Sequence, residues 1–331
     1  MSTPTPAPRT RLTELVGGAQ NVTRAVWDWL RPSPVKPPPW TIVITGASVG
    51  IGLALYRALA DSPHRLVLTA RPGSMGRFAE LGLVESERLL LRSLDVTEKS
   101  QQRAMVDELV ERFGAVDVLV NNAGICFRSV VEHVSTEERL AQTDVNFLAP
   151  MALTKLCLPA MRAQRFGRVV NVSSLGGLSA MPTLAVYSAS KYALEGASEA
   201  LWYEVRPFNI TVCLIEPGFV NSDGFLKARF TAAAQRSYDD PTDPYHRHYR
   251  QMLRLTKALM TLTMFSSDSV ARRIRGVILA RDPPLRVAGT PDAWLFGMAR
   301  RLLPQRLYHL FLYAGLPRVW EWGGRRGPHP R

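Results

Sequence analysis

Cysteine is scarce in this chain: its 331 residues include only Cys126, Cys157 and Cys213. The three lie far apart, and none forms a Cys-x-x-Cys pair or a Cys/His set with the spacing that zinc requires. The sequence therefore predicts no metal site and no disulfide framework. A reducing compartment is expected, and we predict a cytoplasmic location.

Long hydrophobic runs are also absent. A membrane-spanning helix needs roughly 20 apolar residues, and the longest candidate, residues 307–317, is about half that length. The first residues lack the basic start and unbroken apolar run of a secretory signal. We expect neither a membrane-spanning segment nor secretion.

Acidic residues are outnumbered by basic ones, 28 against 41, which gives a net charge of +13. Residues 1–40 carry +3 and residues 281–331 carry +6, so only +4 remains for the 240 residues between them. No nucleic-acid-binding motif accompanies this charge, and we expect no nucleic-acid partner. An anionic membrane surface is a candidate partner for the two basic ends.

The middle of the chain alternates short apolar runs with segments of helical periodicity. The runs are too short for helices and rich in Val, Ile and Leu, as is typical of strands buried on both faces of a sheet. They cover residues 41–45, 65–69, 89–94, 116–121, 168–173 and 211–215, with a last one at 285–288. This order predicts the α/β class: a Rossmann-type, doubly wound parallel sheet of about seven strands with helices on both faces.

Composition divides the chain into three parts. Residues 1–39 form a Pro-rich tail with an amphipathic helix, residues 40–290 the catalytic domain, and residues 291–331 a basic, aromatic, amphipathic extension. Residues 219–265 break the strand pattern and are expected to form a helical lid. Tryptophan and arginine beside an apolar stripe suit the headgroup layer of a membrane. The composition of both ends therefore predicts peripheral membrane attachment. Folding back onto the domain or onto a second subunit explains them equally well.

A glycine-rich turn, Thr45-Gly-Ala-Ser-Val-Gly-Ile-Gly52, comes directly after the first strand. Glycines let the backbone approach a pyrophosphate, and the helix that begins there offers unpaired N–H groups. The spacing alone would also fit a tight packing corner. Further polar motifs stand after other strands: Asn121–Gly124, Ser173-Ser174, Tyr187 with Lys191, and Pro217-Gly218. Because parallel strands end at the same edge of a sheet, one cleft is expected to receive them all.

Tyr187 and Lys191 are four residues apart, so they share one face of a helix. An ammonium group beside the phenol is expected to lower the pKa of Tyr187 from its usual value near 10. Tyr187 would then be a usable general acid and base. On an arbitrary helix, a pair with this spacing is more often a solvated surface pair.

In their order and spacing, these motifs resemble the short-chain dehydrogenase/reductase family over about residues 41–290. The lid segment 242–249 and the helix at 187–196 are most similar to its estradiol 17-beta-dehydrogenase and retinol dehydrogenase types. The resemblance implies an oxidoreductase that moves a hydride between nicotinamide and an alcohol, ketone or aldehyde carbon. A dinucleotide-binding redox sensor or scaffold without turnover is the alternative.

The resemblance also implies four catalytic roles. Tyr187 is the acid/base, and Lys191 holds the nicotinamide ribose. Ser174 hydrogen-bonds the substrate oxygen, with its neighbour Ser173 as the alternative. Asn146 completes a water-linked proton relay.

Cofactor choice depends on the residues just after the second strand, where NAD enzymes usually carry an acid and NADP enzymes an arginine. This sequence has Arg71 and no acid there, which favours NADP(H) over NAD. A solvated surface arginine is the alternative, and Val49 stands where NADP-using relatives often have a polar side chain. The full predicted cofactor set is Gly46, Ser48, Gly50, Ile51, Gly52, Arg71, Asp95, Val96, Asn122, Ala123, Gly124, Tyr187, Lys191, Pro217, Gly218, Val220 and Ser222.

The substrate is predicted to be an elongated lipophilic alcohol or carbonyl compound, such as a steroid, a retinoid or a fatty chain. The predicted substrate-binding residues are Ser174, Tyr187, Phe219 and His246. Met and Phe side chains of the lid could line the pocket or be core, and His246 could belong to a solvated face. Cys126 is expected to line the pocket and not to act as a nucleophile. The resemblance also allows a homodimer through the helices around Ala152 and Ala197.

Overall fold

The computed structural model describes residues 34–221 and 229–323. The chain divides into two compact units, Met1–Val35 and Lys36–Arg331. Nearly all of the first unit, including its predicted amphipathic helix, lies outside the described residues. Ser222, which the sequence places in the cofactor set, lies outside them as well.

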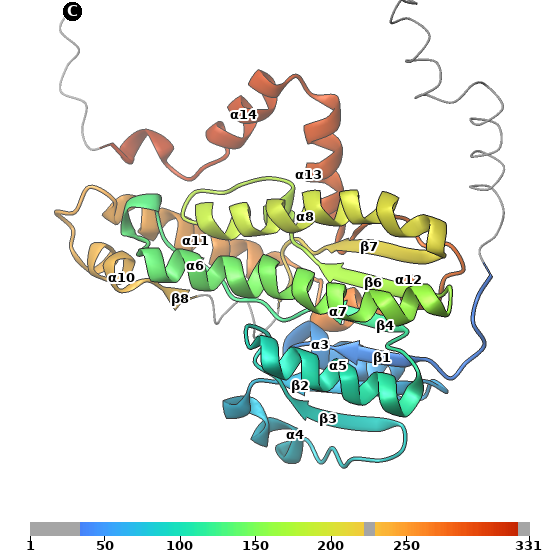
Figure 1. The fold of residues 1–331 in the computed structure, drawn as a ribbon. Helices are drawn as coiled ribbons and strands as arrows, with labels where there is room; N and C mark the ends of the chain where they lie inside the picture. Colours follow the sequence, from blue (N-terminus) through green and yellow to red (C-terminus); the bar gives the residue numbers. More distant parts are fainter. Residues whose placement is uncertain (1–33, 222–228, 324–331) are drawn as a thin grey trace, which may run out of the picture. The chain divides into compact units, whose positions relative to one another are not determined.

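The second unit is built on a parallel sheet (Figure 1). Its strands are β1 (Thr41–Ile44), β2 (Arg65–Ala70), β3 (Leu89–Ser93), β4 (Val118–Asn121), β6 (Gly167–Val172), β7 (Ile210–Glu216) and β9 (Arg286–Ala288). Their spatial order is β3-β2-β1-β4-β6-β7-β9, and every neighbouring pair is parallel. This confirms the predicted Rossmann-type sheet. The order reverses between β1 and β4, where such a sheet opens a crevice at its carboxyl edge.

Helices cover both faces of this sheet (Figure 1). One face is covered by α3 (Gly50–Leu59) and α12 (Ser267–Leu279). The other face is covered by α5 (Lys99–Phe113), α7 (Ala149–Ala163) and α8 (Ala185–Val205).

Strand β1 shows why its sequence is apolar throughout. Successive side chains of a strand point to opposite faces, so Ile42 and Ile44 enter the core cluster that includes Leu55 of α3. Val43 enters the opposite cluster, which includes Leu153 of α7. A sheet with helices on both faces therefore needs continuous apolar runs, and these are the runs visible in the sequence.

The lid contains the helices α10 (Ala232–Asp239) and α11 (His246–Leu262). It also contains a strand that the sequence does not reveal. β8 (Arg229–Phe230) pairs in parallel with β5 (Phe127–Arg128), which comes after β4 in the chain. The expectation of no strand in the lid is therefore wrong, because two residues are too few to show a periodicity.

Short helical segments complete the unit. They are η1 (Pro72–Ser74), α4 (Gly76–Glu80), η2 (Val131–His133), α6 (Thr136–Thr143), η3 (Asp144–Leu148), η4 (Leu175–Gly177) and η5 (Arg206–Phe208). α6 begins with a capping box: Ser135 Oγ accepts from the backbone N–H of Glu138, whose carboxylate accepts from the backbone N–H of Ser135. η3 is a π-helical turn that leads into α7.

The C-terminal residues fold back onto this unit. We call residues 291–323 the C-terminal strap; it consists of α13 (Pro291–Leu302), α14 (Gln305–Ala314) and η6 (Val319–Glu321). In Figure 1 the strap begins with α13 beside α8, continues through α14 and returns toward α11. Within the described residues, no helix is long and apolar enough to cross a membrane.

Four buried side chains attach the strap: Ala293, Tyr308, Val319 and Trp322. Tyr308 Oη lies 2.7 Å from Ser179 Oγ. The ring of Trp322 packs against that of His248 on α11, with 4.6 Å between centroids. These contacts fix one side of the strap and leave its outer side exposed.

Candidate active site

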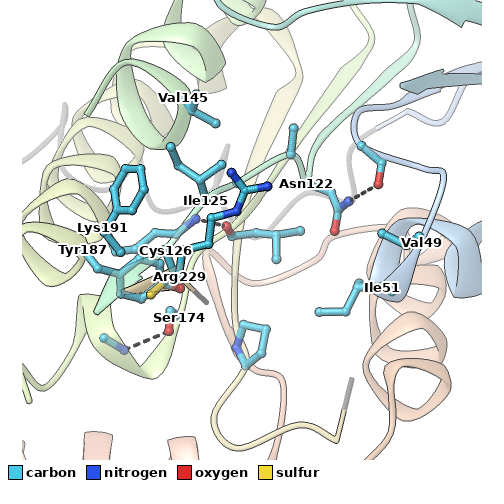
Figure 2. Close-up of a pocket in the computed structure, with 18 of the residues that line it drawn as sticks. Val49, Ile51, Asn122, Ile125, Cys126, Val145, Ser174, Tyr187, Lys191 and Arg229 are labelled. Atoms are coloured by element: carbon cyan, nitrogen blue, oxygen red, sulfur yellow. Dashed lines mark hydrogen bonds between the residues drawn. The ribbon is translucent and has the colours of Figure 1, made fainter. Parts of the chain in front are cut away.

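A cavity of about 1160 Å³ opens at the carboxyl edge of the sheet. It extends from Arg71, after β2, to Thr256 on α11. Figure 2 shows Asn122 on one side of it and Tyr187 and Lys191 on the other. Pockets for a single small ligand usually measure roughly 300–1,000 Å³, so this cavity has room for a large ligand or for two.

The glycine-rich turn lines the cavity where β1 meets α3. Gly46 has φ +65°, and a Cβ there would lie 2.9 Å from Ala123 Cα. A Cβ on Gly52 would lie 2.6 Å from the backbone oxygen of Gly46. Both positions therefore require glycine. The turn brings backbone N–H groups at a helix N-terminus to the cavity, which fits the pyrophosphate of a dinucleotide.

Asn122 clamps this turn to the end of β4. Its Nδ2 donates to the backbone oxygens of Thr45, at 2.8 Å, and Gly46, at 3.2 Å. In return, Thr45 Oγ1 accepts from the backbone N–H groups of Asn122 and Ala123, at 2.9 and 3.0 Å. Asn121 has a different place: its side chain is buried and hydrogen-bonded within the sheet.

The far end of the cavity lies beyond β2 and β3. Arg71 comes after β2, Asp95 and Val96 come after β3, and all three line the cavity. Arg77 and Thr97 line it too, although no sequence motif indicates them. Arg77 belongs to α4, which is too short to show a helical pattern. Arg77 is ion-paired with Glu80, also in the lining, at 2.7 Å, so Arg71 is the arginine of this end that fits a phosphate.

The structure brings nearly the whole predicted cofactor set to the cavity. Gly52 supports the turn from behind, and Ser222 lies outside the described residues. The set members that line the cavity are Gly46, Ser48, Gly50, Ile51, Arg71, Asp95, Val96, Asn122, Ala123, Gly124, Tyr187, Lys191, Pro217, Gly218 and Val220.

Tyr187, Lys191 and Ser174 line the opposite end of the same cavity. Tyr187 lies in the first turn of α8 and Lys191 one turn later. Lys191 Nζ is buried and donates to the backbone oxygen of Val172 at 2.9 Å. Ser174 Oγ accepts from the backbone N–H of Gly176 at 3.0 Å, which holds this hydroxyl after β6 (Figure 2).

The pKa of Tyr187 differs from the sequence-based expectation. Burial raises this pKa, and Cys126 adds to the rise. Ser174 and Arg128 oppose the rise. Lys191 does not produce the expected lowering, because its Nζ lies 6.0 Å from the centre of the Tyr187 ring and is hydrogen-bonded to a backbone oxygen of β6. Burial in turn lowers the pKa of Lys191 to about 8.

Asn146 lies behind the cavity lining, fully buried in the π-helical turn η3. Its Nδ2 donates to the backbone oxygen of Ile125 at 2.9 Å, and its Oδ1 accepts from the N–H of the same residue at 2.9 Å. Nδ2 also lies 3.0 Å from Ser190 Oγ on α8. Such turns are frequent at functional sites because they redirect one side chain. Asn146 thus joins the segment after β4 to α8.

The loop after β7 is held by the beginning of the C-terminal strap. Gly218 N–H donates to Thr290 Oγ1, and Phe219 N–H donates to Asp292 Oδ2, both at 2.8 Å. A Cβ on Gly218 would collide with Asp292. Phe219 lines the cavity, as predicted from the sequence. The sequence did not indicate that the C-terminal extension shapes this loop.

The end of the cavity near α11 is lined by apolar as well as polar side chains. The apolar ones include Val145, Met181, Leu184 and Met252. Cys126 lines it as well, and burial raises the pKa of its thiol to about 11, so the unreactive thiol form prevails at neutral pH.

Two sequence-based expectations for the lid do not match the geometry. His246 does not line the cavity: it is buried at the start of α11, with Nδ1 3.2 Å from the backbone oxygen of Ser237. Met264 is 91% exposed, so it lies in neither the pocket nor the core. Arg128, Arg229 and Thr256 line the cavity instead, and the sequence did not reveal them.

Known proteins agree with this arrangement. Residues 40–231 match the model of the family described as short chain dehydrogenase. A 3-ketodihydrosphingosine reductase from Bacteroides thetaiotaomicron is 38% identical over 209 residues, which are 63% of this chain and 74% of that protein. Human retinol dehydrogenase 8 is 34% identical over 255 residues, which are 75% of this chain and 80% of that protein.

Solved structures share the fold. A short-chain dehydrogenase from Streptomyces avermitilis superposes with a TM-score of 0.70 and 30% identity, covering 84% of this chain and 97% of that one. Among the neighbours, one was solved with NADP, one with 5-hydroxy-NADP and one with NAD. The chain therefore belongs to the short-chain dehydrogenase family, and it is an oxidoreductase acting on an alcohol or carbonyl group.

Proposed function

We propose that this protein is an NADP(H)-dependent oxidoreductase that interconverts an alcohol and a ketone or aldehyde on a lipophilic substrate. The main observation behind the proposal is that two sets of residues line one cavity. The glycine-rich turn and Arg71 lie at one end, and Tyr187, Ser174 and Lys191 at the other. A redox sensor or scaffold would not need proton-carrying side chains at the nicotinamide end.

The chemistry divides between the dinucleotide and the protein. When bound, NADPH supplies the hydride that forms the new C–H bond and is itself oxidised to NADP⁺. Tyr187 Oη gives its proton to the carbonyl oxygen, which becomes the hydroxyl, and accepts it back in the oxidative direction. Ser174 Oγ donates a hydrogen bond to the same oxygen and so stabilises the negative charge that develops there.

Lys191 and Asn146 support this exchange in our proposal. An ammonium group has three N–H bonds, and only one Lys191 bond goes to the backbone of β6. The others would be available to the hydroxyls of the nicotinamide ribose. Asn146 fixes the segment at Ile125 and is the inner end of the predicted proton relay.

NADP is the proposed cofactor because of the charges beyond β2. Arg71 comes directly after the strand and lines the cavity, whereas Arg77 at the same end is ion-paired with Glu80 at 2.7 Å. An arginine fork binds a phosphate through parallel charge-assisted hydrogen bonds. No acid stands at the Arg71 position to accept from a ribose 2′-hydroxyl, as NAD enzymes usually require.

A lipophilic substrate is proposed from the lining and from the relatives. The lining beside Tyr187 includes Met181, Leu184 and Met252. Two relatives bear the names of enzymes for a ketodihydrosphingosine and for retinol. Both names denote long, mainly apolar molecules with one reacting oxygen.

The direct test is Tyr187→Phe, which removes the proton donor and preserves the ring. We expect turnover of steroid, retinoid and fatty alcohols or ketones with NADP(H) to fall at least about 100-fold. NADPH binding, measured by fluorescence titration, should change little and serves as the control for folding. Near-normal turnover in this variant would refute the proposed role of Tyr187.

We also propose that the outer side of the C-terminal strap attaches the protein to an anionic membrane surface. Its exposed apolar side chains include Leu302, Leu310, Phe311 and Trp320, each more than half exposed. Arg300, Arg301, Arg306 and Arg318 lie in the same segment. Basic residues near an anionic surface contribute about 1 kcal/mol each, and the buried apolar area adds to this.

Flotation with vesicles that contain phosphatidylserine tests this attachment. We expect the full chain to float at low salt and less at high salt. The double variant Leu310→Asp, Phe311→Asp should stay in solution. Leu140→Asp is the matched control, because Leu140 is 65% exposed on α6, outside the strap. Equal flotation of both variants would rule out the strap as the anchor.

A further inference from the structure

The chain that leaves β9 runs along the loop after β7. The two strands are paired as far as Glu216 and Ala288, where the regular register ends. The next contact is still between backbones, because Gly289 N–H donates to the oxygen of Glu216 at 2.8 Å. A Cβ on Gly289 would lie 2.8 Å from Pro217 Cα. The two segments are therefore packed closely before the C-terminal strap begins.

Two side chains continue this attachment where the backbone pairing stops. Thr290 Oγ1 accepts from Gly218 N–H, and Asp292 Oδ2 accepts from Phe219 N–H, both at 2.8 Å. A Cβ on Gly218 would lie 2.7 Å from Thr290 Oγ1 and closer still to the carboxylate of Asp292. Glycine is thus required at this position of the loop, because the two side chains occupy the space of its own.

The same two side chains stand at the start of α13, which does not use Thr290 as a cap. Thr290 is the N-cap residue and Asp292 lies in the first turn, but Thr290 makes no capping bond. An N-cap side chain usually accepts from an N–H of its own helix and stabilises it. α12 follows that rule: its N-cap Ser266 accepts from Ser269 N–H, and Asp268 lies in its first turn. Departures from local preference of the kind seen in α13 are expected at functional sites.

The loop held in this way is part of the cavity wall. Pro217 and Phe219 both line the cavity. The backbone oxygen of Pro217 also accepts from Leu175 N–H at 2.7 Å. Leu175 directly follows Ser174, which is proposed to bind the substrate oxygen. One loop therefore connects the start of the strap to the reacting end of the cavity.

We infer that Asp292 of the strap, together with Thr290 before it, is a positioning residue of the active site: the two side chains fix the loop that carries Phe219 and so hold one wall of the substrate site in place. The inference rests on the proposed oxidoreductase function and names residues on which its substrate binding depends. Neither side chain is among the residues that line the cavity. Both act through the backbone of the loop.

Hydrogen exchange tests the attachment without any turnover, by mass spectrometry on peptides of the full chain that cover the loop after β7. The amide of Phe219 should exchange slowly in the parent. In Asp292→Ala it should exchange at least about tenfold faster, the effect of losing a hydrogen bond to a charged group. Asp268→Ala is the matched control, because Asp268 also lies in the first turn of its helix and is exposed. Equal exchange in the parent and in Asp292→Ala would overturn the inference.

Steady-state reduction of retinal and of decan-2-one with NADPH tests the consequence for the substrate. Asp292→Ala should raise KM about tenfold and change kcat by less than about threefold. The reason is that Tyr187 lies on α8 and the Ser174 hydroxyl is held by η4, so neither depends on the strap for its place. Asp292→Asn keeps an oxygen that can accept from Phe219 N–H and should restore most of the parent KM. Equal KM values for the alanine and asparagine variants would overturn the role given to this hydrogen bond.

Variants on the other side of the contact keep the inference testable even where Asp292→Ala does not fold. Thr290→Val loses the hydroxyl and should speed exchange of the Gly218 amide, whereas Thr290→Ser keeps it and should not. Gly218→Ala collides with Asp292, so its KM increase and that of Asp292→Ala should combine to less than their product. A KM increase in Asp268→Ala equal to that in Asp292→Ala would overturn the inference and leave the oxidoreductase function intact. If Asp292→Ala loosens the loop but the parent reduces no carbonyl compound, the proposed function fails and the attachment of the loop stands.

Discussion

The two halves of the cavity are built in different ways. The half beside α3, which we call the cofactor half, consists of strand ends and backbone groups, with Asn122 hydrogen-bonded to the turn after β1. The half beside α11, which we call the substrate half, is assembled from segments that include β5, β8 and α11, and Asp292 of the C-terminal strap holds the nearby loop after β7. Motifs within a few residues of a strand end build the first half, whereas tertiary contacts between distant segments build the second.

This difference implies different tolerance to change. In the cofactor half, backbone atoms approach each other so closely that two glycines have no room for a side chain. In the substrate half, the contacts run between side chains, for example from Arg128 to Thr256 at 3.2 Å. Side chains can be exchanged without moving the sheet, so this half can change its specificity while the cofactor half stays constant.

The largest expected effect on cofactor binding comes from Gly52→Ala in the cofactor half. The new Cβ would lie 2.6 Å from the backbone oxygen of Gly46 and 2.7 Å from Asn122 Nδ2, so the turn must move. Overpacking of this kind costs roughly 1–3 kcal/mol, up to about 100-fold in affinity. NADPH titration should show this loss. Gly73→Ala is the control: Gly73 also lines the cavity, but its Cβ would meet nothing within 4 Å. A similar loss in both variants would mean that the turn is not the rigid part of the site.

A smaller effect is expected from Arg71→Asp. The carboxylate repels a 2′-phosphate and can accept from a 2′-hydroxyl, so the preference for NADPH over NADH should fall about tenfold. The ratio of kcat/KM for the two cofactors measures this change, and substrate KM should stay constant because Arg71 lies in the cofactor half. Arg88→Asp, an exposed change outside the cavity, is the control. A parent enzyme that uses both cofactors equally well would contradict the role given to Arg71.

The same division explains how much could be predicted from the sequence. The parallel sheet and most residues of the cofactor half are predictable from apolar runs and from motifs at strand ends, because those features are local. Arg128 and Arg229 gave no such signal, since they meet the cavity only through a two-residue strand pair. His246 was misplaced because resemblance in a lid segment does not fix which way a helix turns its side chains.

The pKa of Tyr187 shows a second limit. The spacing of Tyr187 and Lys191 correctly indicates one helix face, but it carries no information on burial. Burial raises the pKa of the phenol and lowers that of the ammonium to about 8, which the spacing alone could not reveal. The sequence also could not reveal the contact of Asp292 with the backbone of Phe219, because this contact depends on the chain returning after β9.

The smallest expected effect comes from Tyr308→Phe in the strap. Tyr308 Oη and Ser179 Oγ are 2.7 Å apart, and both side chains are buried. The variant therefore removes this hydrogen bond and leaves the Ser179 hydroxyl without its Tyr308 partner. Such a loss costs about 1 kcal/mol, or roughly fivefold in an equilibrium constant. Because Ser179 lies in the segment that leads to the cavity residues Met181 and Leu184, the expected change is a KM for substrate raised about threefold to fivefold.

NADPH affinity should not change in Tyr308→Phe, since the cofactor half has no contact with this pair. Tyr313→Phe is the matched control, because Tyr313 is 59% exposed on the same helix, α14. Its kinetic constants should equal those of the parent. If Tyr308→Phe instead weakens NADPH binding as much as substrate binding, the two halves of the cavity are energetically coupled. Their different construction would then not make their binding free energies independent. If both tyrosine variants behave like the parent, the contact between the strap and Ser179 has no influence on substrate binding.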